Sequence, residues 1–308
     1  MKTEQILFTG FGGTQLYAMI WQPEGEAKAV LQIAHGMTEH MGRYQRLAED
    51  LCGQGIAVAG FDLRGHGRNA QHPEIASCGQ GGWAASMEDM ALFSGELRLR
   101  FPGIPHYMLG FSLGSFLLRE YLGIYPDNVA GAIIAGTGHE PGWLLGILTA
   151  IVEGEMKKAG FDGTTALVRQ LSFGTYNQQF KPNRTEADWL CGDGAELDSY
   201  LSDPLVRKEI SAGLFRELLA SMKRTGKAAH YTAWNQEMPI LLLYGTEDPV
   251  GKSGKGVMRL YDILQKAGLR NLTCQQFPGA RHDIFHEEAS GTAETVRHCI
   301  AEWLTERF

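Results

Sequence analysis

Cysteine is scarce in this chain and scattered along it. The 308 residues include five cysteines, all far apart and none in a Cys-x-x-Cys pair. This number and spacing exclude a disulfide framework and a zinc ribbon. The N-terminal stretch MKTEQILFTG also lacks the apolar segment of a secretory signal peptide. We therefore expect a reducing, cytoplasmic location.

Long apolar runs and charged runs are also absent. No apolar segment reaches the roughly 18 residues of a membrane-spanning helix. The nearest, residues 141–152, would extend only about 18 Å as a helix, so transient contact with a membrane surface is the most we expect of it. The formal net charge is −7, without a run of five or six like charges. Nucleic acid is therefore not an expected partner, and nothing in the sequence indicates an oligomeric state.

Glycine, in contrast, is abundant, with 39 in 308 residues, which is well above the average of roughly 7% and indicates many tight turns. Between these turns lie short apolar runs of strand length, at residues 5–9, 16–21, 29–34, 56–61, 106–111, 130–135, 239–244 and 269–277. Helix-length amphipathic segments alternate with them, at residues 43–53, 83–100, 112–125, 253–267 and 292–304. This alternation predicts an α/β fold with a mostly parallel sheet, whose first two strands form an antiparallel hairpin at one edge.

The alternating pattern is interrupted once. Residues 139–235, called the insertion below, have helical periodicity, several aromatic residues and no good strand pattern. We therefore predict a core formed by residues 1–138 and 236–308, with a helical cap, or lid, formed by residues 139–235. An insertion of this size is expected over the carboxyl edge of the sheet, where open α/β sheets bind ligands.

The clearest chemical signal is the pentapeptide Gly110-Phe111-Ser112-Leu113-Gly114. It follows an apolar strand and opens an apolar helix, which is the setting of a nucleophile elbow. In such a turn the nucleophile has strained backbone angles, and a side chain two residues to either side would clash. Ser112 is therefore the predicted nucleophile.

A serine needs a base, and the base needs an acid that orients it. His282 is the predicted base because it follows the last strand and precedes the final helix, with His286 as a nearby competitor. Asp248 is the predicted acid because it follows the strand at 239–244, and the adjacent Glu247 is the alternative. The order serine, aspartate, histidine is the order typical of this architecture.

Main-chain N–H groups should stabilise the oxyanion that forms during acyl transfer. We predict the N–H of Leu113, directly after the nucleophile, and the N–H of Met37, in the loop after an early strand. His35 is expected to shape that loop rather than to transfer protons. The charged residues of segment 62–68 are expected to form a loop network.

Two other chemistries have weaker support. The cluster of acidic and histidine residues at 282–287 resembles a set of metal ligands, but no third ligand occurs at a recognisable spacing. The stretch from Gly245 to Ser253 suggests a phosphate loop, but it has five residues rather than four between its glycines. We therefore expect no metal and no bound nucleotide.

The chain contains, in this order, the five segments HGMTEHMGRY, FDLRGHGRN, GFSLG, LLLYGTEDP and GARHDIFHE. Together they resemble the α/β-hydrolases of the monoacylglycerol lipase and lysophospholipase group, which is similar in turn to the serine aminopeptidase family. The resemblance implies an eight-stranded, mostly parallel sheet, a helical cap and no cofactor. It also implies the same nucleophile, acid, base and oxyanion donors at Ser112, Asp248, His282, Met37 and Leu113.

The predicted function is hydrolysis of carboxylic esters through an acyl-enzyme, with medium or long monoacyl esters, such as monoacylglycerol or lysophospholipid, as substrates. The resemblance implies that Glu39 and Arg43 line the polar end of the substrate site. We also expect substrate contacts from Trp143, Tyr176 and Val250. Three alternatives remain open: a serine aminopeptidase of the proline iminopeptidase type, an acyltransferase, and a non-catalytic receptor for a small molecule.

Overall fold

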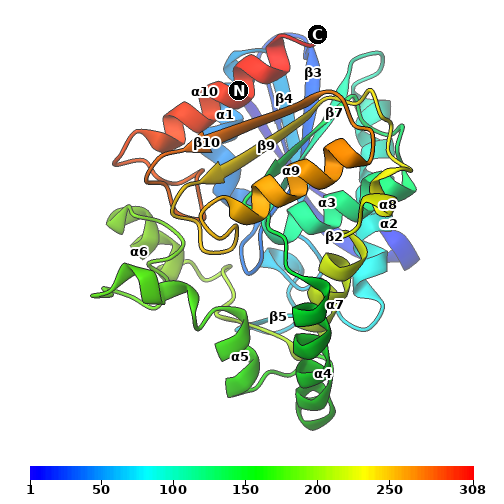
Figure 1. Cartoon of the computed structure of the whole chain (residues 1–308). Coiled ribbons are helices and arrows are strands. Elements are labelled where there is room, and N and C mark those ends of the chain that lie inside the picture. The colour runs from blue at the N-terminus through cyan, green and yellow to red at the C-terminus, as the bar shows by residue number, and fades with distance from the viewer.

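The computed structural model describes all 308 residues, and an eight-stranded sheet runs through it (Figure 1). In spatial order its strands are β1 (Lys2–Thr9), β2 (Gln15–Gln22), β4 (Ile56–Phe61), β3 (Ala29–Ala34), β6 (His106–Phe111), β7 (Gly131–Ala135), β9 (Ile240–Gly245) and β10 (Leu272–Phe277). Only β2 runs against its neighbours. The predicted strands and the edge hairpin of β1 and β2 are therefore confirmed.

The central strands have apolar residues because both of their faces are covered. Every residue of β3, β4, β6, β7 and β9 is buried. A parallel strand buried on both sides has a continuous apolar sequence rather than an alternating one, as in the ILLLYG of β9. The edge strand β10 keeps alternating exposed positions.

Helices pack on both faces of the sheet. One face is covered by α1 (Gln45–Gly53) and α10 (Thr292–Thr305), and the other by α2 (Gly82–Arg100), α3 (Leu113–Ile124) and α9 (Lys255–Lys266). Neighbouring strand residues point to opposite sides, so that Val30 packs in one apolar cluster and Leu31 in the other. Three short 3-10 helices, η1 (Phe11–Gly13), η2 (Met41–Tyr44) and η3 (Gly67–Asn69), lie in the connecting loops.

The insertion is mostly helical and lies between β7 and β9. Its elements are α4 (Gly142–Ala159), α5 (Ala166–Ser172), η4 (Tyr176–Phe180), α6 (Gly194–Ser202), α7 (Ala212–Arg224) and α8 (Ala228–Tyr231). In Figure 1 α4, α5, α6 and α7, drawn in green to yellow-green, lie below the sheet. No helix of the chain combines the length and the hydropathy that crossing a membrane requires.

One element of the insertion differs from the expectation. The sequence predicts no strand there, yet β8 (Glu209–Ile210) pairs in parallel with β5 (Ile75–Ala76) in a separate small sheet. Two residues are too short to produce a periodic pattern, so this pairing depends on tertiary contact. The division into core and cap stays a prediction.

Candidate active site

Ser112 lies in a strained turn between β6 and α3. Its backbone angles are φ 50° and ψ −112°, a conformation that few residues other than glycine adopt. A Cβ on Gly110 would lie 2.5 Å from the carbonyl oxygen of Gly114, and a Cβ on Gly114 would lie 1.9 Å from that of Ala34. Both glycines are therefore required by close backbone contact, as the pentapeptide pattern predicts.

The structure brings Ser112, His282 and Asp248 together from three loops. Nε2 of His282 lies 2.9 Å from Oγ of Ser112, and Nδ1 of His282 lies 2.9 Å from Oδ1 of Asp248. His282 follows β10, and Asp248 follows β9. Both side chains are almost completely buried. The two distances are those of hydrogen bonds, so a proton can pass from the hydroxyl to the imidazole.

The electrostatic setting favours a charged imidazole. Burial alone would lower the pKa of His282, but the charge and hydrogen bond of Asp248, together with the charges of Asp283 and Glu39, outweigh burial, so the pKa lies above its ordinary value. Asp248 also accepts a hydrogen bond from the N–H of Val250 at 2.8 Å, which helps to orient its carboxylate. The arrangement can therefore stabilise the imidazolium that forms when Ser112 loses its proton.

The competing residues have other partners. Glu247 has an exposed side chain. His286 donates from Nδ1 to Asp283 and from Nε2 to the carbonyl of Arg43. Glu287 accepts hydrogen bonds from the main-chain N–H groups of Gly192 and Arg281. Asp283 and His286 of segment 282–287 bond to each other, but no three of the acidic and histidine residues of this segment are placed to hold a metal ion together.

Beside Ser112, two main-chain N–H groups make no hydrogen bond to a protein acceptor. They belong to Met37, in the loop after β3, and to Leu113, the first residue of α3. The first N–H groups of a helix have no partner inside it, and the helix dipole favours negative charge there. These are the two N–H groups that the sequence predicts as oxyanion donors, and that role stays a prediction.

His35 holds the main chain of the loop that contains Met37. Its Nδ1 lies 2.7 Å from the carbonyl oxygen of Gly36, and its Nε2 accepts a hydrogen bond from the N–H of Leu63 at 2.9 Å. Burial lowers the pKa of His35 to about 3, so the ring is neutral. Within the segment 62–68, Asp62 accepts the N–H groups of Met41 and Arg68. Both features are structural, in agreement with expectation.

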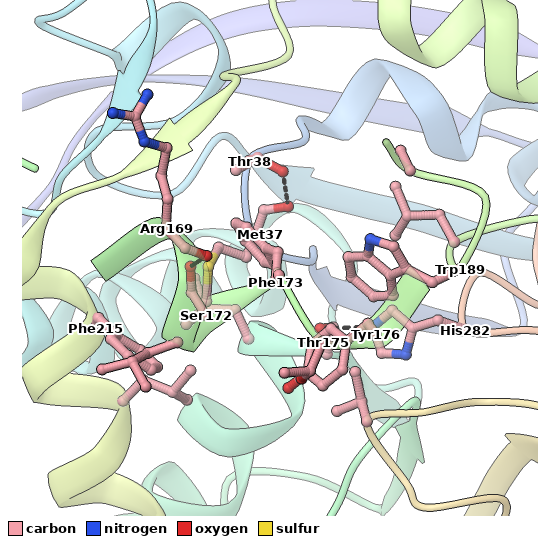
Figure 2. Close-up of a pocket in the computed structure, with 18 of the residues that line it drawn as sticks. Met37, Thr38, Arg169, Ser172, Phe173, Thr175, Tyr176, Trp189, Phe215 and His282 are labelled. Carbon is pink, nitrogen blue, oxygen red and sulfur yellow. Dashed lines mark hydrogen bonds between the residues drawn. The ribbon is translucent and has the colours of Figure 1, made fainter. Parts of the chain in front are cut away.

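A cavity of about 690 Å³ opens beside Ser112, and 22 of its 38 lining residues are hydrophobic. In Figure 2, Trp189 and His282 lie at the opposite side of the cavity from Phe215. Among the predicted substrate contacts, Glu39, Tyr176 and Val250 border this cavity. Its size and apolar lining suit a small organic or lipid ligand.

Two predicted substrate contacts do not border the cavity. Trp143 is 70% exposed on α4. Its neighbours Leu144, Leu145 and Leu148 face the cavity instead, and one residue of a helix turns the side chain by about 100°. Arg43 is buried in ion pairs with Glu39 and Asp283, so its guanidinium is directed into the protein.

Sequence reasoning predicted Tyr176 at the site but missed Trp189, which packs against His282, and Phe173, which packs against Trp189. The ring of Trp189 lies 5.3 Å from the imidazole, and the rings of Tyr176 and Phe173 lie 5.0 Å and 5.7 Å from Trp189. The main chain next to Trp189 also contacts the loop that contains His282. The carbonyl of Leu190 accepts a hydrogen bond from the N–H of Asp283 at 2.7 Å. The only sequence signal was the abundance of aromatic residues in the insertion, which does not say which of them reach the site.

Sequence similarity to known lipases extends over nearly the whole chain. It is 26% identical to the monoglyceride lipase of Homo sapiens over 296 residues, which cover 96% of this chain and 88% of that enzyme. It is 25% identical to the monoacylglycerol lipase of Mycolicibacterium smegmatis over 294 residues, which cover 91% of this chain and 90% of that enzyme.

Solved structures show the same fold. A carboxyl esterase from Bacillus coagulans, solved in complex with glycerol, superposes with a TM-score of 0.88 at 21% identity and covers 100% of this chain and 99% of that one. The expected α/β-hydrolase fold is thus confirmed. The family model described as serine aminopeptidase, S33, matches residues 25–289. That match spans most of the chain, and the protein belongs to the S33 serine aminopeptidase family.

Proposed function

We propose that the protein is a serine hydrolase that cleaves carboxylic esters of a single acyl chain, with monoacylglycerol-type esters as substrates. The observation that carries the proposal is the hydrogen-bonded series of Ser112, His282 and Asp248 at one wall of an apolar cavity. The names of the two lipases to which the chain is similar support the substrate class.

The mechanism follows from these contacts. Oγ of Ser112 attacks the acyl carbon while Nε2 of His282 takes the hydroxyl proton, and Asp248 stabilises the resulting imidazolium. The tetrahedral oxyanion accepts from the N–H groups of Met37 and Leu113. The tetrahedral intermediate then collapses. The alcohol leaves with the proton from His282, and the acyl group remains bound to Ser112 as an ester. Water then attacks this acyl-enzyme with His282 as base, releasing the acid and restoring the hydroxyl.

The walls of the cavity favour an acyl chain. Leu145 and Leu148 of α4 and Phe215, Leu219 and Met222 of α7 all line it. Burying one methylene group stabilises a complex by about 0.8 kcal/mol. An ester whose chain extends along these residues should therefore react faster than a short one.

This expectation can be measured with a series of nitrophenyl esters. We expect kcat/KM to rise about fourfold for each methylene added to short chains, from 0.8 kcal/mol per group, so that octanoate exceeds acetate by more than 100-fold. A strict preference for acetate would contradict the lipid substrate and leave the esterase mechanism intact. Parallel assays with monoacylglycerol and lysophospholipid then identify the head group.

The aminopeptidase alternative requires an acidic side chain that is free to bind the substrate amine. Of the acidic residues that line the cavity, Glu39 and Asp283 pair with Arg43, Glu140 pairs with Lys252, and Asp203 with His40. The fifth, Glu186, is exposed. Because four of these five carboxylates already have cationic or histidine partners and Glu186 is exposed to solvent, the arrangement favours esters over amines.

We further propose that α4 touches a lipid surface when it collects its substrate. Trp143, Ile147 and Ile151 follow one another at helical spacing and are 70%, 52% and 37% exposed, and Leu167 of the neighbouring α5 is 42% exposed. Residues four apart lie on the same side of a helix. This stripe is apolar enough to enter the interfacial layer of a membrane without spanning it.

The contact can be tested by flotation with phosphatidylcholine vesicles. We expect part of the wild-type protein to float with the vesicles and the Ile147→Ser variant to remain in the aqueous fraction, with unchanged kcat on a dissolved short-chain ester. Equal flotation of the two proteins would contradict a role for this stripe. Glu153→Ser, at an exposed position of the same helix, is the control.

We also infer a cytoplasmic location from the thiol groups. The five cysteines form no disulfide. Burial raises the pKa of Cys52 and Cys274 to about 11, so these thiols remain protonated and unreactive at neutral pH. Unpaired cysteines of this kind are typical of a reducing compartment.

A further inference from the structure

We propose that Glu39 is a positioning residue, which forms with Arg43 and Asp283 a clamp that holds the loop of Met37 in place against the loop of His282. The proposal rests on the proposed function, because it concerns the two loops that would supply an oxyanion donor and the base. It assigns to Glu39 and Arg43 a role other than substrate binding.

The clamp is continuous from one loop to the other. Oε1 of Glu39 accepts the N–H of Gly36 at 2.6 Å, and Oε2 of Glu39 accepts Nε of Arg43 at 3.0 Å. Nη2 of Arg43 donates to Oδ2 of Asp283 at 2.8 Å, and Asp283 directly follows His282. A single guanidinium therefore joins the two loops through a carboxylate on each side.

The Glu39 contact controls the direction of the Met37 N–H. The peptide group between Gly36 and Met37 is planar and trans, so its carbonyl and its N–H point in opposite directions. Nδ1 of His35 holds this carbonyl at 2.7 Å, while Glu39 holds the N–H on the other side of Gly36. With both sides of Gly36 held, the Met37 N–H has one orientation, and it has no acceptor in the protein.

The loop has little freedom and needs such contacts. A Cβ on Gly36 would lie 2.8 Å from Oε1 of Glu39 and 2.9 Å from Cδ1 of Phe111, so the carboxylate packs directly on the backbone. The next residue but one, Thr38, has φ 68°, which is strained for a β-branched residue. Such strain persists only where the surroundings hold the residue in place.

The two carboxylates of the clamp each have further hydrogen-bond partners inside the protein, which argues against substrate binding. Oε1 of Glu39 accepts a second hydrogen bond, from the hydroxyl of Tyr44 at 2.7 Å. Asp283 also accepts from Nδ1 of His286 at 2.9 Å. Burial would raise the pKa of Asp283, but His286 and Arg43 outweigh it and hold the pKa well below its usual value. The carboxylate therefore stays ionised and paired with the guanidinium.

The test is the substitution Glu39→Gln, which keeps the size of the side chain and removes its charge. The amide group cannot accept from both Gly36 and Arg43 as the carboxylate does. We expect kcat to fall about 10- to 100-fold, somewhat less than the loss of a complete oxyanion donor, with KM changed less than threefold. The inhibition constant of an alkyl trifluoromethyl ketone, whose adduct carries the oxyanion, should rise in parallel with the loss in kcat.

A substrate-binding role predicts the opposite result, which is a raised KM with an unchanged kcat, and that outcome overturns the clamp. The matched control is Asp89→Asn on α2. Asp89 is also a buried carboxylate that accepts a main-chain N–H, from Phe11, and pairs with an arginine, Arg64. It does not border the cavity. We expect this control to lose stability and to keep kcat within threefold.

Hydrogen exchange provides a readout that needs no turnover. The Gly36 amide should exchange faster in Glu39→Gln than in the wild type or in Asp89→Asn, because its acceptor is weakened. Unchanged exchange would overturn the clamp. If the wild type hydrolyses no ester, the proposed function fails, and the exchange rates still decide whether Glu39 holds the loop.

Discussion

Replacement of Ser112 by alanine is expected to lower kcat for ester hydrolysis by about 10⁵- to 10⁶-fold. The variant loses the atom that would form the acyl bond, and the hydroxyl that lies 2.9 Å from Nε2 of His282. The cavity keeps its apolar lining, so the variant should still bind the ester. A stopped assay with a nitrophenyl ester, together with binding of the same ester measured by calorimetry, separates the two effects.

The control for this result is Ser86→Ala. Ser86 is a buried serine whose hydroxyl donates to the carbonyl of Gly82 inside α2, and it does not border the cavity. Its loss should leave kcat within twofold. Ester turnover that is the same in Ser112→Ala and in the wild type would remove Ser112 from the mechanism and end the serine-hydrolase proposal.

The second large effect is expected from Asp248→Asn, which should lower kcat by about 10⁴-fold. The asparagine amide can donate where the carboxylate only accepts, so His282 can adopt the tautomer with its proton on Nε2. In that tautomer Nε2 cannot take the proton of Ser112. The residual activity should also have a different dependence on pH.

The sign of the pH effect follows from the charges around His282. The imidazole must be neutral to act as base, so activity falls as pH drops through its pKa. Asp248 is the main group that raises this pKa, with smaller contributions from Asp283 and Glu39. In the wild type the acid limb of kcat/KM should lie above pH 6.5, the ordinary value for histidine. In Asp248→Asn it should move to lower pH.

Glu247→Gln is the matched control, because it removes the neighbouring acidic group from the same loop. The Glu247 side chain is exposed and forms no hydrogen bond. Its main-chain carbonyl accepts from Nε2 of Gln179 at 2.7 Å, and its main-chain N–H donates to the carbonyl of Ala280 at 2.9 Å. We expect kcat within twofold of the wild type and an unchanged acid limb. A loss at Glu247 with none at Asp248 would reverse the assignment of the acid.

Much of the fold could be predicted because the relevant signals are local. The runs that become β3, β4, β6, β7 and β9 are apolar throughout, since each strand is covered on both faces. The sharp turn at Ser112 likewise leaves a local pattern, because only glycine fits at positions 110 and 114. The polar residues that follow these strands could be predicted to meet because strand ends share one edge of the sheet.

The walls of the cavity could not be predicted in the same way. Which side of α4 faces the cavity depends on its packing against α7, and the sequence of α4 is apolar on several sides, so Trp143 and Leu144 were equivalent candidates. The contact between Trp189 and His282 joins segments that are distant in the chain. The resemblance implied that Arg43 lies at the substrate. The sequence could not indicate that Arg43 pairs with Asp283 instead, because Asp283 belongs to a distant loop.

Labelling with a fluorophosphonate, followed by peptide mass spectrometry, shows whether Ser112 is an activated nucleophile, because the reagent reacts with a serine that an adjacent base has activated. We expect one label per chain, on the peptide that contains Ser112. We also expect greatly slowed labelling in Asp248→Asn and unchanged labelling in Glu247→Gln. A wild-type protein that remains unlabelled, or that carries its label on another residue, would show that Ser112 is not the activated nucleophile.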